Sequence, residues 1–581
     1  IAAQVLARAV KDLYPQAKLA IGPVIDHGFY YDIDFPNPPS SEDLSKIEAR
    51  MREIVASKAK IIRKNFSRAE ALAYFANKGE SYKQEIINDT PAQPGEVFGM
   101  YHQDGTDFAD LCRGPHVPSL DKIGAFKLTH LAGAYWRGDS KNKMLTRIYG
   151  VAFNTPKELD AHLHMLAEAA KRDHRKIGPA LDLFHLQEEA PGQVFWHHKG
   201  WQIYLQLQNY IRAKLRAHNY QEVNTPQRVS VDLYKKSGHW DNYKENMFFV
   251  QVDEKNLFSM KPMNCPCHVQ IFNQGIKSYR DLPIRMSEFG TCMRNEATGA
   301  LHGLMRVTTM VQDDAHIFCT IDQIGEEVVQ LCALIKEIYT ELGFGEPFVK
   351  FSDRPEKRVG SDAVWDKAES ALKDACTQAN LPWVLNAGDG AFYGPKLEFV
   401  LRDCLNRDWQ CGTVQLDFNL PERLGATYVG EDGQRHTTVM IHRALLGSLE
   451  RFMGILIENF AGNFPLWLAP TQVVLTGITD KQNPAVEALC ARLKAAGLRA
   501  EVDLRNEKVN YKIREHSIGK IPVIGVVGDK EIADDTITIR RLGSPAQTTL
   551  KVADLISQLQ DEVARKALPP HAVNLDDEAA A

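Results

Sequence analysis

Long hydrophobic runs are missing from this sequence: none approaches the roughly 20 apolar residues that span a bilayer, so we expect no association with a membrane. Residues 1–10 are apolar but carry Arg8, and they lack the basic start and small-residue cleavage site of a secretion signal. Because the chain begins with Ile rather than Met, we expect a further segment upstream of it. Together these absences predict a cytoplasmic protein.

The chain also has few cysteines for its length and a small net charge. The ten cysteines are scattered over 581 residues without the dense spacing of a disulfide-stapled domain, which predicts reduced thiols and leaves room for a metal site. The net charge of −5 comes from 69 basic and 74 acidic residues, so the chain has no global electrostatic signature of a nucleic-acid binder. Any contact with RNA must therefore depend on local patches.

The length and the pattern of elements predict a multidomain α+β protein. At 581 residues, with 44% hydrophobic and 25% charged residues, the chain exceeds what one hydrophobic core supports. Composition and periodicity divide it into an α+β module (1–155), a linker helix (156–180), an antiparallel α+β domain (181–468), a small α/β domain (469–565) and a flexible tail (566–581). The basic run at 171–176 is expected to face solvent.

Apolar periodicity places individual elements. In the central domain we expect strands over 305–311, 316–319, 396–401 and 413–418. The linker helix should run over 156–177 and stop at Gly178 and Pro179. The C-terminal domain alternates strands (473–475, 499–504, 521–527, 536–541) with helices (484–496, 508–518, 552–563), which favours a βαβ-type sheet covered by helices.

One cysteine and two histidines stand near expected strand or loop ends: Cys265, His316 and His442. Three protein ligands with an open fourth position are what a catalytic zinc requires, and a thiolate with imidazoles suits that ion. The alternative is ordinary packing, because a lone buried Cys or His is more often a core residue. Cys267 and His268 lie beside Cys265 and compete as ligand candidates.

Charged side chains next to glycine-containing segments suggest a nucleotide site. Arg294 precedes a glycine-containing loop over 297–303, and an Arg there can bind an α-phosphate bidentately while Glu296 orients an adenine amino group. Arg451, which opens a helix after Gly447, is a second candidate phosphate clamp. For each Arg taken singly, the alternative is a surface ion pair.

These segments resemble the signature motifs of class II aminoacyl-tRNA synthetases. Residues 289–296 resemble motif 2, residues 447–451 resemble motif 3, and the helix that ends before 222–226 resembles motif 1 with its interface proline, Pro226. Further segments resemble the threonyl-tRNA synthetase family in particular: KPMNCP (261–266), RPEKRVGSD (354–362), GAFYGPKLEF (390–399), CGTVQLDF (411–418), YVGEDG (428–433) and FPLWLAPTQVV (464–474). The similarity runs from about residue 9 to about residue 565.

The resemblance implies a class II antiparallel-sheet catalytic core, an N-terminal α+β editing-like domain and a C-terminal α/β anticodon-binding domain. It implies a homodimer that activates L-threonine with ATP and Mg²⁺ through a threonyl-adenylate and then charges tRNA(Thr). It also implies one Zn²⁺ per chain on Cys265, His316 and His442. In that family zinc binds the amino group and hydroxyl of threonine, so valine is refused because its methyl is no ligand.

The resemblance also assigns site residues. The implied catalytic residues are Arg294, Arg451 and Lys396. The implied ATP-binding residues are Arg294, Glu296, Arg306, Met310, Gln410, Thr413, Ser448 and Arg451. Those implied for threonine are Met263, Gln312, Asp314, Tyr393 and Gln415, and Asp314 would accept a hydrogen bond from the substrate hydroxyl. Asn506, Glu531 and Arg540 match positions that read anticodon bases.

Near the implied active site the chain departs from the family pattern. Met310 stands where a Phe usually stacks under adenine, Thr308 and Thr309 replace an Arg-Gly pair, Met293 replaces a His, and Cys267 replaces a Gly. Met packs on a purine face without ring stacking. We therefore expect ATP binding to persist and to be weaker.

The N-terminal domain keeps one half of the site with which the family removes serine wrongly attached to tRNA. Asp110, Cys112 and His116 match that half. The other half, two histidines four residues apart, falls at Gln4 and Arg8. Since neither side chain supplies an imidazole to activate water, we expect impaired editing.

Three functions are open at this point. The leading one is a working threonyl-tRNA synthetase. The second is a specialised paralogue, for example one that tolerates an inhibitor or serves a biosynthetic pathway, which the substitutions at Cys267, Met293 and Met310 favour. The third is a catalytically silent RNA-binding regulator, against which the intact Arg294 and Arg451 argue, together with the complete set of zinc ligands.

Overall fold

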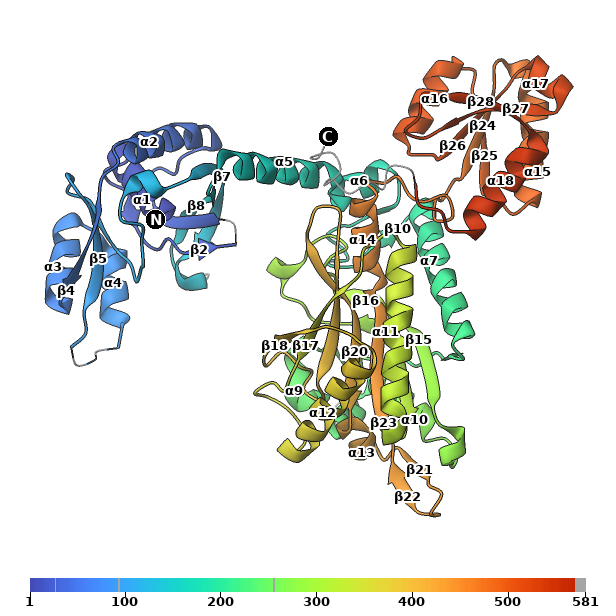
Figure 1. Cartoon of the computed structure of the whole chain (residues 1–581), viewed down its shortest axis with the longest axis horizontal. Helices are drawn as coiled ribbons and strands as arrows, with labels where there is room; N and C mark the ends of the chain where they lie inside the picture. The colour runs from blue at the N-terminus through green and yellow to red at the C-terminus, as the bar shows by residue number, and fades with distance from the viewer. Residues whose placement is uncertain (27, 92, 94, 140, 254–255, 570–581) are drawn as a thin grey trace. The chain divides into compact units, whose positions relative to one another are not determined.

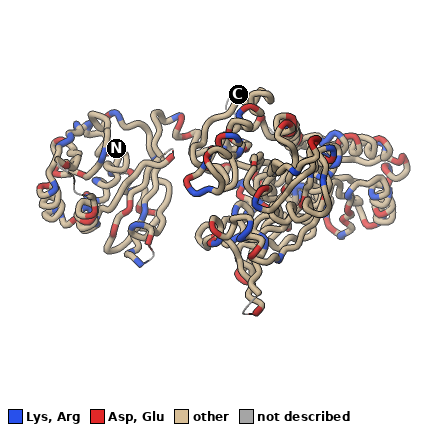
Figure 2. Tube along the Cα trace, turned by 90° about the horizontal axis from the view of Figure 1, so that it is seen from below, with Lys and Arg blue, Asp and Glu red and all other residues tan. Residues whose placement is uncertain are grey.

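The computed structural model describes residues 1–581 except 27, 92, 94, 140, 254–255 and 570–581, and it comprises two compact units, Ile1–Ala167 and Glu168–Ala581 (Figure 1). No helix in the described residues is long and apolar enough to cross a membrane. Lys and Arg are interspersed with Asp and Glu along the chain (Figure 2). Most of the expected tail, residues 570–581, lies outside the described part.

The first unit is an α+β structure with two small antiparallel sheets. The larger sheet contains β1 (Lys18–Leu19), β2 (Val24–Ile25), β3 (Gly28–Asp34), β7 (Ala125–Tyr135) and β8 (Met144–Phe153). Helices α1 (Ala2–Leu13) and α2 (Leu44–Ala56) bury their apolar faces in the core shared with it. The second sheet contains β4 (Ile61–Phe66), β5 (Phe98–Gln103) and β6 (Ala109–Leu111), and α3 (Arg68–Lys78) and α4 (Ser81–Asp89) accompany it.

The expected linker helix is interrupted. It forms α5 (Pro156–Arg172) and α6 (His174–Ala180), because Asp173 leaves helical geometry and its carboxylate accepts a backbone N–H of the next helix as an N-cap. The predicted stop at Gly178 is wrong, since that residue lies inside α6. The basic run is also not wholly exposed, because His174 is fully buried.

The second unit is built on an eight-stranded sheet in the order β11-β15-β16-β23-β20-β19-β17-β18. The six strands from β15 to β17 pair antiparallel, while the outer pairs β11–β15 and β17–β18 are parallel. The strands are β11 (Gln221–Glu222), β15 (Ile284–Met293), β16 (Thr309–Cys319), β17 (Phe348–Ser352), β18 (Val384–Asn386), β19 (Lys396–Arg402), β20 (Asp408–Asp417) and β23 (Val439–Ser448). Such a mostly antiparallel sheet confirms the fold class expected for this region.

Helices bury the apolar side chains of this sheet. Those around the core are α7 (His198–Ala217), α10 (Cys265–Phe272), α11 (Ile324–Glu341), α12 (Asp362–Gln378), α13 (Asn419–Leu424) and α14 (Leu449–Asn459). Shorter elements are β9 (Phe184–His185), β10 (Phe195–Trp196), β12 (Arg228–Ser230), α8 (Val231–Ser237), α9 (His239–Tyr243), β13 (Phe249–Gln251), β14 (Leu257–Met260), β21 (Thr427–Val429) and β22 (Arg435–Thr437).

The strand predicted over 305–311 is wrong in its first half, because β16 begins only at Thr309. The preceding residues turn instead, and the backbone N–H of Leu304 donates to Nε2 of the distant His174 at 2.9 Å. A turn over residues 303–305, closed by a bridge between His302 and Arg306, therefore stands where the strand was expected to begin.

The C-terminal part of the second unit carries a five-stranded sheet in the order β25-β24-β26-β27-β28. Its elements are β24 (Val473–Gly477), α15 (Asn483–Ala495), β25 (Ala500–Asp503), α16 (Val509–Ile518), β26 (Val523–Val527), α17 (Asp529–Asp534), β27 (Thr536–Arg541), β28 (Gln547–Lys551) and α18 (Val552–Ala564). Alternate residues of β24 point to opposite faces: Val473 packs with α15 and α18, and Val474 packs with α16. The predicted βαβ alternation is confirmed.

Candidate active site and metal centre

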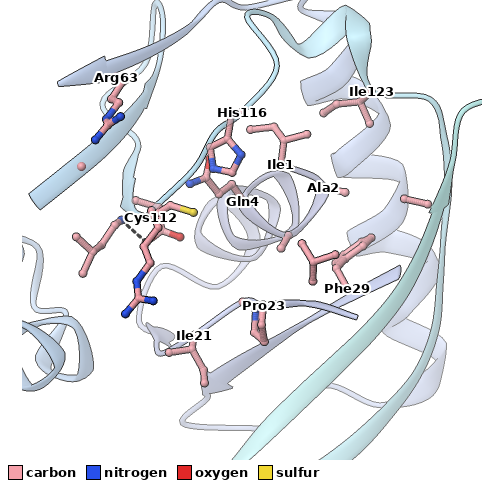
Figure 3. A pocket seen from close by; sticks show the side chains of 18 of the residues that line it. Ile1, Ala2, Gln4, Ile21, Pro23, Phe29, Arg63, Cys112, His116 and Ile123 are labelled. Atoms are coloured by element: carbon pink, nitrogen blue, oxygen red, sulfur yellow. Dashed lines mark hydrogen bonds between the residues drawn. The ribbon is translucent and has the colours of Figure 1, made fainter. Parts of the chain in front are cut away.

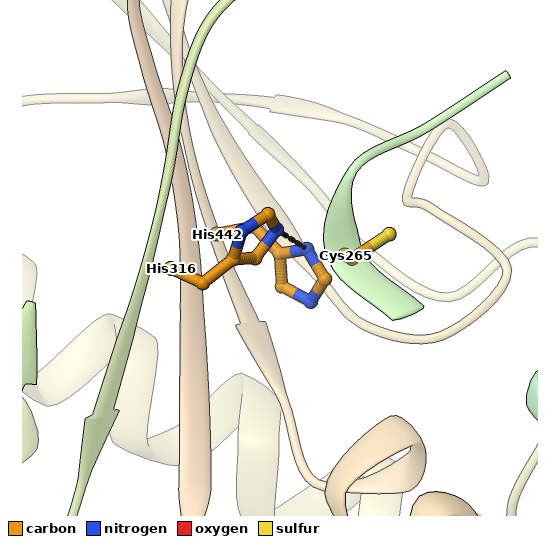
Figure 4. A group of neighbouring side chains, drawn as sticks. All are labelled: Cys265, His316 and His442. Atoms are coloured by element: carbon orange, nitrogen blue, oxygen red, sulfur yellow. Dashed lines mark hydrogen bonds between the residues drawn. The ribbon is translucent and has the colours of Figure 1, made fainter. Parts of the chain in front are cut away.

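Cys265, His316 and His442 come together in the second unit. Cys265 opens α10, while His316 and His442 are paired neighbours on the antiparallel strands β16 and β23, so both imidazoles project from the same face of the sheet (Figure 4). Their ligand atoms all lie within 4.8 Å of one another, and His316 Nε2 lies 3.1 Å from His442 Nδ1. All three residues are buried.

The electrostatics of this cluster favour a bound cation. Burial raises the pKa of the Cys265 thiol well above its usual range, and Asp314 and Asp417 raise it further. Burial also lowers the pKa of His316 well below its usual range, as do the neighbouring imidazoles. A sulfur and two neutral imidazole nitrogens are a donor set that suits zinc, and a cation there would stabilise the thiolate.

The residues expected around threonine lie beside this cluster. Tyr393 stacks on the His442 ring with centroids 4.5 Å apart, and its hydroxyl donates to the side-chain oxygen of Gln415, which pairs with His442 across the sheet. Asp314, two residues before His316, accepts a 2.9 Å hydrogen bond from Asn264. Met263 packs in the same apolar cluster as Cys265 and Tyr393, and Gln312 accepts from Cys292 at 3.5 Å.

The expected phosphate-binding residues lie at the ends of the motif 2 strand and the motif 3 helix. Arg294 follows β15, and its Nε donates to the carbonyl of Pro262 at 3.3 Å. Arg451 lies in the first turn of α14, with its guanidinium 5.7 Å from the ring centroid of Trp409. Ser448 caps that helix by accepting the N–H of Arg451 at 3.2 Å.

The remaining expected nucleotide contacts hold partners within the chain. Arg306 donates to Glu296 through two nitrogens, at 2.8 and 3.0 Å. Lys396 pairs with Glu398 and Asp389. Gln410 and Thr413 lie on β20, next to β23 in the sheet. Met310 is buried with Cys292 and Val307.

The residues expected to read the anticodon belong to the C-terminal sheet domain. Glu531, in the first turn of α17, accepts the N–H of Gly528 and the hydroxyl of Thr538, each at 3.0 Å. Arg540 lies on β27, and its buried Nε has no hydrogen-bond partner in the described residues. Asn506 is exposed in the connection between β25 and α16.

The first unit contains a cavity of about 1250 Å³ lined by Gln4, Cys112 and His116 (Figure 3). Burial lowers the pKa of His116 to about 4, so the ring is neutral at physiological pH. Nε2 of Gln4 and Nε2 of His116 are buried without a hydrogen-bond partner among the described residues. Arg8 instead lines a separate cavity of about 240 Å³.

Asp110, which also lines the large cavity, is held by two donors. Its carboxylate pairs with Lys83 Nζ at 2.6 Å and accepts the hydroxyl of Tyr31 at 2.6 Å. All three side chains are buried. A carboxylate held by two donors in this way orients its neighbours.

Comparison with known proteins decides the family. Residues 248–460 match the tRNA synthetase class II core domain (G, H, P, S and T), 472–562 match the anticodon binding domain, and 99–149 match the threonyl and alanyl tRNA synthetase second additional domain. The chain is 60% identical to a threonine–tRNA ligase of Rhodospirillum rubrum over 562 residues, 97% of this chain and 87% of the relative. It is 58% identical to that of Paramagnetospirillum magneticum over 98% of this chain and 88% of the relative. The chain belongs to the threonine–tRNA ligase family.

Solved structures agree with this family membership. A structure titled as the RNA binding domain of threonyl-tRNA synthetase from Cryptosporidium parvum matches with a TM-score of 0.64 and 40% identity, covering 67% of this chain and 98% of that one. A putative threonyl-tRNA synthetase from Aeropyrum pernix matches with a TM-score of 0.60 and 27% identity, covering 68% and 98%. The class II core, the anticodon-binding domain and the editing-type domain expected from the sequence are therefore all confirmed.

In this threonine–tRNA ligase family member, the sequence did not reveal how two residues support the cluster of Cys265, His316 and His442. His268 was considered only as a competing ligand, yet its Nδ1 lies 2.8 Å from Nδ1 of His316. Glu288 accepts from His268 Nε2 at 3.0 Å. Burial opposes the charge of Glu288, but the hydrogen bonds from His268 and Thr225 and the charge of Lys261 lower its pKa to about 2. The available signal was spacing, because His268 follows Cys265 by three residues on one helix face.

Proposed function

We propose that this chain activates L-threonine with ATP to form a threonyl-adenylate and transfers the threonyl group to the 3′-terminal ribose of tRNA(Thr). Membership in the threonine–tRNA ligase family supports the reaction. The observation that carries the choice of amino acid is the buried cluster of Cys265, His316 and His442, whose ligand atoms lie within 4.8 Å of one another.

In this proposal Cys265, His316 and His442 would hold one Zn²⁺, which would supply a Lewis acid for the amino group and hydroxyl of threonine. Asp314 accepts the hydrogen bond of that hydroxyl, and Tyr393 with Gln415 closes the pocket beside His442. A buried polar site of this kind rejects a substrate without the hydroxyl by about 10⁴ or more. Valine is thereby excluded, although its shape matches threonine.

Activation needs no covalent intermediate on the protein. The carboxylate of threonine attacks the α-phosphate of ATP in line, and pyrophosphate leaves. Arg294 and Arg451 stabilise the charge that develops on the phosphate oxygens, with Lys396 near the adenylate and Mg²⁺ arriving bound to ATP. Glu296 is paired with Arg306 at 2.8 Å in this structure. We therefore infer that adenine replaces Arg306 as the partner of Glu296.

Recognition of tRNA uses the C-terminal domain, where Asn506, Glu531 and Arg540 contact anticodon bases. The segment around Pro226, which resembles motif 1, pairs two copies into a homodimer. All ten cysteines are free thiols, which suits the reducing cytoplasm in which we place the reaction.

Threonine-dependent exchange of pyrophosphate into ATP tests the proposal directly. We expect robust exchange with threonine and none with valine. No exchange by the folded protein would instead support the silent RNA-binding relative.

A specialised, inhibitor-tolerant ligase is the second candidate. The observation that favours it is Met310, which is buried with Cys292 and Val307 where the family carries a stacking ring. Comparing inhibition of this protein and a related ligase by a compound that occupies the adenine site separates the two candidates.

A further inference from the structure

A single line of short polar contacts runs through the cluster of Cys265, His316 and His442 and ends in a carboxylate on each side. Glu288 Oε2 lies 3.0 Å from His268 Nε2, and His268 Nδ1 lies 2.8 Å from His316 Nδ1. His316 Nε2 then faces His442 Nδ1 at 3.1 Å, and His442 Nε2 lies 2.8 Å from Asp417 Oδ2. All five side chains are buried, so water does not compete for these bonds.

Asp417 determines which ring nitrogen of His442 carries the hydrogen. Its other oxygen accepts the backbone N–H groups of Asn419 and Leu420 at 2.7 and 3.0 Å, so the carboxylate acts as an acceptor throughout. His442 must therefore carry its hydrogen on Nε2, which leaves a lone pair on Nδ1. That lone pair points toward His316.

Glu288 determines, through His268, which ring nitrogen of His316 carries the hydrogen. The carboxylate accepts the N–H of Thr225 at 2.7 Å and the ammonium of Lys261 at 3.1 Å, so it too is an acceptor. His268 then carries its hydrogen on Nε2 and accepts with Nδ1. The Nδ1 of His316 must donate to His268, which leaves a lone pair on Nε2 of His316.

The two carboxylates thus turn two lone pairs toward each other across 3.1 Å, an arrangement that needs a cation between them. We propose that Glu288, acting through His268, is a positioning residue that sets the metal-binding tautomer of His316, as Asp417 does directly for His442. This inference rests on the proposed zinc site and adds the residues that orient its two imidazole ligands. One ligand is oriented by a carboxylate and the other through an intervening imidazole.

The same carboxylate also anchors the segment that carries the third ligand. Lys261 and Thr225 both donate to Glu288, and Lys261 begins the KPMNCP segment in which Cys265 lies. Glu288 therefore holds the orientation of His316 and the start of the loop before Cys265 together. A glutamine at this position keeps an oxygen toward Lys261 and Thr225, so it preserves this anchor and alters the contact with His268.

The test is the zinc affinity of the full-length chain, measured by competition with a chromogenic chelator. In Glu288→Gln the side-chain amide keeps its oxygen toward Lys261 and Thr225 and presents its NH₂ to His268. The hydrogens of His268 and His316 then each move to the other ring nitrogen, so Nε2 of His316 carries a hydrogen. We expect a 10- to 100-fold loss of zinc affinity, about the effect of removing an outer-shell partner.

Two further variants make the result specific. Glu327→Gln alters a buried carboxylate that pairs with Arg285 away from the cluster, and it should leave zinc affinity unchanged. In a His268→Ala background, Glu288→Gln should cause no further loss, because the intermediary is gone. An affinity for Glu288→Gln within about twofold of the unmodified chain, or additive losses in the double variant, would overturn the inference.

Failure of the proposed metal site and failure of a variant to fold can each be told apart from failure of this inference. If the unmodified chain binds no zinc, the proposed metal site itself fails, independently of any variant. If Glu288→Gln does not fold, as judged by circular dichroism, Asp417→Asn carries the test from the other end of the line. It is expected to lose 10- to 100-fold in affinity, and an unchanged affinity would overturn the inference.

Discussion

Arg8 donates a hydrogen bond of 2.8 Å to the side-chain oxygen of Gln103. Arg8 lies on α1 and Gln103 ends β5. Arg8 also lines the smaller cavity of the first unit. Gln4, one helical turn earlier, lines the large cavity with Cys112 and His116. The two replacements of the expected histidine pair therefore point into different cavities.

We first predict that the chain activates some serine and clears it poorly. Removing one methyl from threonine costs a pocket only about 1–3 kcal/mol, and serine keeps both zinc-binding groups. Among the described residues that line the large cavity, His116 is the one histidine; burial lowers its pKa to about 4, and position 4 is a glutamine. Since a positioned acid–base group contributes about 10²–10⁴ in rate, purified seryl-tRNA should be deacylated slowly or not at all.

The combined variant Gln4→His with Arg8→His should restore part of this hydrolysis, because a histidine at position 8 lacks the guanidinium that reaches Gln103 and lies one turn from position 4 on the same face of α1. Adding Cys112→Ala to that variant is the control, because Cys112 lines the same cavity and its loss should abolish the gain. Rapid hydrolysis of seryl-tRNA by the unmodified chain would show that Cys112 and His116 suffice.

The second prediction concerns the metal. Elemental analysis of the purified chain should find one zinc per chain, and Cys265→Ala should lose it because three ligands become two. Cys267→Ala is the matched control, since Cys267 lies two residues away and outside the cluster of ligand atoms. Full zinc occupancy in Cys265→Ala would contradict this ligand set.

The third prediction separates the two substrates. Replacing Glu531 or Arg540 by Ala should impair charging of tRNA by about 1–3 kcal/mol while leaving threonine activation near its normal rate. Arg541→Ala is the matched control, because neighbouring residues of β27 point to opposite faces and Arg541 pairs with Glu562 at 2.8 Å. Equal losses of charging and activation would indicate a folding defect instead.

The fourth prediction is a homodimer. The segment before Pro226 resembles the motif through which class II cores pair, and closed two-fold assemblies are the commonest oligomers. Light scattering at micromolar concentration should give twice the 65.3 kDa mass of one chain. A monomeric mass under these conditions would contradict the prediction.

The fifth prediction is a pH dependence of stability from Glu450. This residue is 4% exposed, and burial raises the pKa of its carboxyl from 4.5 to about 7. A raised carboxyl pKa means that the folded state favours the neutral form, so its contribution is full below pH 4.5 and is lost as pH rises through 7. The shift corresponds to roughly 3 kcal/mol.

Glu450→Gln removes this titration and keeps the hydrogen-bonding shape. The melting temperature of the unmodified chain, relative to the variant, should therefore fall between pH 5 and pH 8. Differential scanning calorimetry at both pH values measures it, with Glu42→Gln, an exposed carboxylate on the first unit, as the control. A constant difference across this range would show that Glu450 does not titrate there.

The sequence by itself determined the family, the fold class and the nature of the ligand cluster. Motifs such as residues 261–266 and 289–296 are local strings, so their recognition needs no coordinates. Short apolar runs also predicted β24 and β26, because strands buried on both faces leave a continuous hydrophobic trace, and helical periodicity predicted the helices between them. Cys265, His316 and His442 were selected as a possible ligand set and do converge in space.

Tertiary structure alone decided how the selected side chains are oriented and which partners they have. Glu288 and His268 acquire their relation to His316 from strand pairing and helix packing, which no local string encodes. Asp173 breaks the linker helix, and the late start of β16 accompanies a bond to His174 from far along the chain. A hydrogen bond depends on distance and angle in three dimensions, whereas periodicity records only which face of an element is buried.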